Sequence, residues 1–127
     1  MLGEEYALEY LPLFDEELAA AVRYIAQKLR NPIAAKALVD DVEQAITERL
    51  FAPEAFEPIQ SAKEREHPYY KIAVGNYLVL YCVVEKVMEV RRFVYAPSDW
   101  QSPHGYKRLP ENLWPERTWW ENVKSYF

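Results

Sequence analysis

The stretch YYKIAVGNYLVLYCVVEKVMEVRRFVY, residues 69–95, decides the fold, because its apolar residues follow the two-residue period of β-strands. Gly75-Asn76 and Glu85-Lys86 divide it into three runs, and each pair is short enough to form a tight turn. Connections this short join neighbouring strands in opposite directions. The stretch therefore predicts three antiparallel strands, near residues 70–74, 77–84 and 86–95.

The residues before this stretch change to the period of helices. A short strand is expected over YALEY, residues 6–10, and Pro12 ends it because proline cannot donate a ladder hydrogen bond. Apolar residues then recur every three or four positions between residues 18 and 29, which predicts a helix with Asp15 as its N-cap. Pro32 suits the first turn of a second helix. With so few residues between them, the two helices should form an antiparallel hairpin.

The composition fits one domain and excludes several kinds of function. The chain has 127 residues, and 50% of them are hydrophobic, which suffices for one packed core. No glycine-rich phosphate loop occurs, and Cys82, His67 and His104 do not form a zinc motif, so we expect no cofactor and no metal. No run approaches the ~20 apolar residues of a membrane span, and the N-terminus lacks signal-peptide features. We therefore expect a cytoplasmic protein without membrane contact.

The predicted order of elements, one strand, two helices and three strands, resembles the RelE/ParE superfamily, the toxins of bacterial type II toxin–antitoxin pairs. YALEYLPLFDEELAAAVRYIAQKL and NPIAAKALVDDVEQAITERL are similar to its leading strand and helical hairpin. Residues 70–100 are similar to its C-terminal half, with Gly75-Asn76-Tyr77, Tyr81 and Arg92 at recurrent positions. The similarity covers roughly residues 4–100.

The resemblance implies an α+β fold in which the helical hairpin packs on a small antiparallel sheet. It places a toxin domain at residues 1–100. Residues 101–127 are expected to form a Trp-rich C-terminal extension that packs on the same domain.

The resemblance also implies a function with two forms. A ParE-like toxin inhibits DNA gyrase and is not an enzyme, whereas a RelE-like toxin cleaves mRNA on the ribosome. The implied partners are a cognate antitoxin, gyrase or the ribosome with its mRNA, and a second copy of the chain in a homodimer. An inactive member that serves as an antitoxin- or protein-binding module is the alternative, and the acidic net charge of -5 favours it. A metal-free hydrolase ranks last, because no nucleophile–base pair is visible.

Cleavage of mRNA by 2′-hydroxyl attack needs cations at the scissile phosphate and a group that transfers a proton. The residues of these types on the sheet, implied as catalytic by the resemblance, are Lys71, Arg91, Arg92 and Tyr95, with His104 and Tyr106 as further candidates in the tail. Leu78 stands where the family often has arginine, and Pro97 and Ser98 stand where it often has basic residues. We therefore expect weak or absent RNase activity.

Strand alternation places Arg91, Phe93 and Tyr95 on one face of the last strand and Arg92 and Val94 on the other. On this basis the two arginines cannot act together, and Arg92 shares the core side with Met88 and Val90. Two roles remain open for Arg92. It is either functional or bound in a structural ion pair with a helix carboxylate such as Asp41, Glu43 or Glu48.

Overall fold

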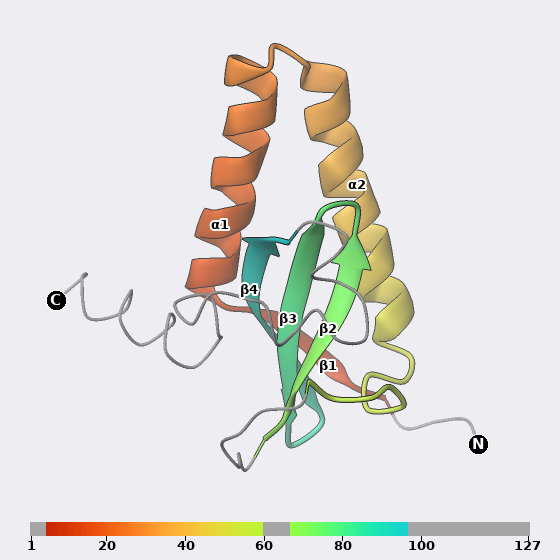
Figure 1. Cartoon of the computed structure of the whole chain (residues 1–127). Coiled ribbons are helices and arrows are strands. Elements are labelled where there is room, and N and C mark those ends of the chain that lie inside the picture. Colours follow the sequence, from red (N-terminus) through yellow and green to blue (C-terminus); the bar gives the residue numbers. More distant parts are fainter. Residues whose placement is uncertain (1–4, 60–66, 97–127) are drawn as a thin grey trace, which may run out of the picture.

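The computed structural model describes residues 5–59 and 67–96, in which a helical hairpin stands on a four-stranded sheet (Figure 1). In chain order the elements are β1 (Ala7–Tyr10), α1 (Pro12–Arg23), the π-helical turn η1 (Tyr24–Lys28), α2 (Pro32–Arg49), β2 (Tyr69–Val74), β3 (Tyr77–Val84) and β4 (Val87–Tyr95). This is the α+β order that the sequence predicts. The expected C-terminal extension, residues 101–127, lies outside the described residues.

The sheet has the strand order β1-β4-β3-β2. The pairs β2–β3 and β3–β4 are antiparallel, which confirms the predicted meander. β1 pairs with β4 in parallel, from Ala7 beside Val87 to Tyr10 beside Val90, so the sheet as a whole is mixed. The reason is the connection: the chain leaves β1 through the helical hairpin, and a crossover of that length permits parallel pairing.

The two tight turns of the meander use left-handed backbone conformations. Gly75 has φ +59°, which glycine adopts without steric cost. At the β3–β4 turn Glu85 has φ 50° and Lys86 has φ 67°. Positive φ at both central residues is the type I′ turn, which suits the twist of a hairpin but is unfavourable for residues with side chains.

Pro12 both ends β1 and begins α1. The N-cap is Leu11, so the predicted N-cap at Asp15 is wrong, and Asp15 instead lies in the first turn of the helix. Proline is tolerated at the first helical position because its missing N–H would have no partner there. α2 begins in the predicted way at Pro32, and the Asn31 side chain accepts a hydrogen bond of 3.0 Å from the Ala34 N–H.

The first helix ends in the π-helical turn η1. The Leu29 N–H bonds to the Tyr24 carbonyl at 3.1 Å, a spacing of five residues where an α-helix has four. The wider turn displaces the predicted apolar stripe. Leu29 is 57% exposed, although its sequence spacing places it with Leu18, which packs against the core.

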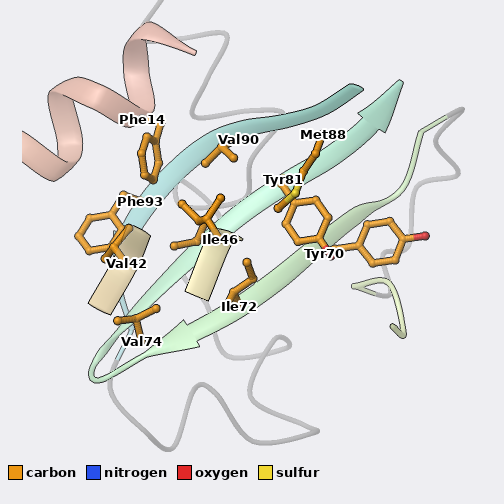
Figure 2. Close-up of a cluster of buried hydrophobic side chains, with 11 residues drawn as sticks. Phe14, Val42, Ile46, Tyr70, Ile72, Val74, Tyr81, Met88, Val90 and Phe93 are labelled. Carbon is orange, nitrogen blue, oxygen red and sulfur yellow. The ribbon is translucent and has the colours of Figure 1, made fainter. Parts of the chain in front are cut away.

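The main core lies between the helical hairpin and one face of the sheet (Figure 2). Phe14 from α1 and Val42 and Ile46 from α2 are its fully buried helical members. The strands contribute Tyr70, Ile72, Val74, Val79, Tyr81, Met88, Val90 and Phe93. Within residues 5–59 and 67–96, neither helix has the length and apolar character that a bilayer span requires.

A smaller buried cluster forms on the opposite face of the sheet. Its members are Leu78 and Leu80 from β3 with Val94 and Ala96 at the end of β4, and Ile59 packs against them. Both faces of β3 are therefore buried, as its continuous apolar run predicts.

Candidate functional site: the arginine face of the sheet

A β-bulge in β4 brings Arg91 and Arg92 to the same face. Tyr81 pairs with Val90 and Leu80 pairs with Arg92, so Arg91 is an additional residue in β4 with no partner of its own. The predicted separation of the two arginines is therefore wrong. Alternation of side chains holds along an uninterrupted strand, and one extra residue reverses it for every position that follows.

We call this surface the arginine face; it is the sheet face opposite the main core, and it carries Lys71, Arg91 and Arg92. Lys71, Leu80 and Arg92 form one row across β2, β3 and β4, and paired residues in a sheet share a face. Arg91 joins them because its side chain bonds to Tyr69 of β2. The sequence predicts that Arg92 shares a face with Met88 and Val90. In the structure it lies on the opposite face.

Arg92 is buried in an ion pair with α1. Its side chain is 2% exposed, and its Nε donates to Glu17 Oε1 at 2.8 Å while Nη2 donates to Glu17 Oε2. Glu17 Oε1 also accepts a 2.9 Å bond from the Phe93 N–H. Among the described residues no partner is present for Nη1.

One of the two roles expected for Arg92 is a structural ion pair with a helix carboxylate. A structural ion pair with a helix carboxylate exists, but the carboxylate comes from α1 and not from Asp41, Glu43 or Glu48 of α2. β1 pairs with β4 only up to Val90, so the edge of β4 beyond that point is open to α1. Glu17 uses this gap to reach both the guanidinium and the strand backbone.

Arg91 is held by Glu89 and Tyr69. Its Nε and Nη2 donate to Glu89 Oε1 at 3.1 and 2.6 Å, and its Nη1 donates to the Tyr69 hydroxyl at 2.9 Å. Burial acts to lower the pKa of Arg91, but the hydrogen bonds that it donates to Glu89 and Tyr69 outweigh this and raise the pKa above its ordinary value. The guanidinium is therefore charged and already paired with a carboxylate.

Tyr95 lies apart from the other candidates. It pairs with Tyr77 on the helix-bearing face, where the two rings meet edge to face at 5.6 Å, and its side chain is 57% exposed. The structure thus brings together Lys71, Arg91 and Arg92 but not Tyr95. His104 and Tyr106 lie outside the described residues.

Tyr81 also stands at a position that recurs in the RelE/ParE superfamily, and its role in this structure is structural. Its hydroxyl donates to the Pro53 carbonyl at 2.7 Å and accepts from Arg49 Nη1 at 2.9 Å. Burial raises the pKa of Tyr81, which keeps the phenol neutral and unsuited to act as a base. The Arg49 guanidinium lies 3.6 Å from the centre of the Phe56 ring, so this network ties the segment after α2 to the sheet.

Sequence reasoning missed Glu17 and Arg49. Both contact the sheet from helices, and their partners are 75 and 32 positions away. For Glu17 the sequence gives a weak indication of contact with the sheet, since Glu17 stands on α1 next to Leu18, which packs against the core. No local pattern identifies the strand that it reaches.

The arginine face offers little excess positive charge. Glu17 and Glu89 each neutralise one arginine, and Leu78, where a further cation is often found in the family, is buried in the smaller cluster. In the described part of the chain, no group of histidine, cysteine and carboxylate residues could hold a metal ion. The arrangement fits a binding surface better than a site that stabilises a pentacoordinate phosphate.

Comparison of this chain with solved structures shows the class of fold to which it belongs. A chain described as the chromosomal ParDE toxin–antitoxin system from P. aeruginosa matches with a TM-score of 0.60 and 13% identity, over 72% of this chain and 96% of that chain. Residues 8–100 match the model of the ParE toxin of the type II toxin–antitoxin system parDE. The protein therefore belongs to the ParE toxin family. A comparison with curated proteins found no match.

Proposed function

We propose that this ParE-family protein is a toxin that inhibits DNA gyrase by binding it in the cytoplasm, and that it does not cleave mRNA. The pairing of both sheet arginines with carboxylates of the same chain carries the proposal. Removal of one well-placed donor to a developing negative charge costs roughly a hundredfold to a thousandfold in rate. A site whose arginines are neutralised from within lacks that stabilisation, whereas inhibition by binding does not need it.

A cognate antitoxin is the second partner that we propose. Family membership in a toxin–antitoxin system supports it. Antitoxins of such pairs supply a segment that folds on binding, and an interface of this kind buries about 1,200 Å² or more. Co-expression with the small proteins encoded next to this chain tests the proposal, and a stable complex that survives gel filtration is the expected result.

The same neutralised arginines also favour a second candidate, an inactive member that retains antitoxin binding. Growth after induced expression separates the two. A toxin stops growth and an inactive binding module does not. For a toxin, purified protein should inhibit DNA supercoiling by gyrase and leave ribosome-bound mRNA intact.

A further inference from the structure

The far end of the helical hairpin exposes apolar side chains. Ile33 is 83% exposed, Leu29 57% and Tyr24 55%. Figure 1 shows this end of the hairpin rising beyond the ends of the strands. We call Tyr24, Leu29 and Ile33, with the charged residues between 18 and 39, the hairpin tip.

The hairpin tip is basic on a protein that is acidic overall. Between Glu17 and Asp40 every charged residue is a cation, namely Arg23, Lys28, Arg30 and Lys36, whereas the whole chain has a net charge of -5. Lys36 pairs with Asp40 at 3.2 Å across one helical turn. Charge of this sign complements an acidic surface on a partner and steers the encounter with it.

Two irregular backbone features lie at the hairpin tip. The π-helical turn η1 ends at Lys28, and Arg30 then adopts φ 51° before α2 begins. A left-handed conformation is unfavourable for a residue with a side chain, and π-helical turns occur often at functional sites. Leu29 follows this turn directly and is 57% exposed.

We propose that the hairpin tip docks this toxin on the protein that it inhibits, through an acidic surface with an apolar recess that receives Leu29 and Ile33. The proposal rests on the proposed function, since it names the surface that meets the target. Exposed aliphatic side chains contribute little to contacts with phosphates, which favours a protein over a nucleic acid. Tyrosine and arginine beside an apolar anchor are typical of the centre of a protein interface.

The test compares two equally exposed apolar residues at opposite ends of α2. Ile33→Ser changes the tip, and Phe51→Ser changes a side chain that is 84% exposed just after the other end. The amount of protein that halves growth after induction, and the amount that halves supercoiling by purified DNA gyrase, should rise about tenfold or more for Ile33→Ser. Phe51→Ser should change both by less than about twofold.

A charge pair of variants completes the design. Lys28→Glu should weaken inhibition as Ile33→Ser does, and Lys86→Glu should not, since Lys86 lies at the β3–β4 turn, at the opposite end of the molecule (Figure 1). All four variants should keep the melting temperature within a few degrees and still co-purify with the antitoxin. These controls show that the fold and the antitoxin surface are intact.

Three results would overturn the docking proposal. The first is full growth inhibition by Ile33→Ser. The second is loss of antitoxin binding together with toxicity in that variant, which would assign the tip to the antitoxin. The third is tight binding of a short DNA duplex that depends on Lys28 but not on Ile33. If growth arrest depends on Ile33 while gyrase is unaffected, the tip proposal stands and the gyrase target is wrong.

Discussion

Arg92 and Glu17 are 75 positions apart in the sequence, yet they join the last strand to the first helix through a buried ion pair with Nε 2.8 Å from Oε1. The same carboxylate oxygen accepts the Phe93 N–H, so one side chain caps an open strand edge and neutralises a buried guanidinium. Arg92 stands at a position that recurs in the RelE/ParE superfamily. Its geometry here assigns it to the stability of the hairpin on the sheet.

Loss of Glu17 should destabilise the protein strongly. Glu17→Leu leaves the Arg92 guanidinium buried without a counter-ion, and breaking a buried pair in this way costs about 3–5 kcal/mol. The expected loss is near the lower figure because Glu17 itself is 21% exposed and water reaches it. Urea denaturation measures the free energy of unfolding. Glu43→Gln, an exposed carboxylate of α2, is the control and should change it by less than about 0.5 kcal/mol.

The double variant Glu17→Leu with Arg92→Met tests the cause of that loss. Replacing both partners of a buried ion pair by apolar groups is often nearly neutral. We therefore expect the double variant to be more stable than Glu17→Leu alone. A double variant that is less stable than the single one would contradict this explanation.

The β3–β4 turn should accept a stabilising substitution. Glu85 and Lys86 both have positive φ, which the type I′ turn requires and which asparagine and glycine adopt more readily. Glu85→Asn with Lys86→Gly should raise the free energy of unfolding by about 1 kcal/mol. Gly75→Ala, in the other turn, should lower it by a similar amount, because Gly75 has φ +59°, which is unfavourable for alanine. A Cβ there would meet no atom within 4 Å, so no clash adds to this loss. A shift of the free energy of unfolding in the same direction for both changes would contradict the claim that positive φ determines the stability of these turns.

Stability should decline above about pH 10, the ordinary pKa of tyrosine. Burial raises the pKa of Tyr77 and Tyr81 in the folded protein, so the folded state holds their protons more firmly than the unfolded state. The resulting stabilisation is complete below the unfolded pKa and is lost as the pH rises through the folded one. Melting temperatures between pH 7 and 11 measure it. Tyr77→Phe should flatten the decline, and an unchanged decline in that variant would contradict the explanation.

Cations of the arginine face should matter little for toxicity. Lys71→Ala and Arg91→Gln should change the growth-inhibiting dose by less than about threefold once stability is accounted for, because inhibition by binding at the hairpin does not use them. A catalytic cation at a phosphate would give a loss of roughly a hundredfold or more. The dose–response curve after induction, with Tm measured in parallel, distinguishes the two.

The sequence predicts most of the fold because local periodicity records which side of each element is buried. The meander, the helical hairpin and the start of α2 follow from residues within a few positions of one another. The parallel pairing of β1 with β4 does not, since it depends on the path of a crossover. The bulge at Arg91 is invisible for a different reason: two adjacent arginines in an apolar strand do not show which of them lacks a cross-strand partner.

The sequence does not predict how the candidate cations are arranged on the sheet. Lys71, Arg91 and Arg92 do share a face, although the alternation rule separated the arginines. Their neutralisation by Glu89 and Glu17 changes what the face can do. One partner is two positions away and could have been noticed, while the other is brought in by tertiary structure.

The central claim is inhibition of gyrase by binding without RNA cleavage, and one paired titration tests it most directly. The purified protein is added to DNA gyrase in a supercoiling assay and, at the same concentrations, to ribosomes that hold an mRNA in the A site. The account predicts loss of supercoiling that the antitoxin reverses, with the mRNA intact. Unaltered supercoiling together with A-site cleavage that Lys71→Ala or Arg91→Gln abolishes would contradict it.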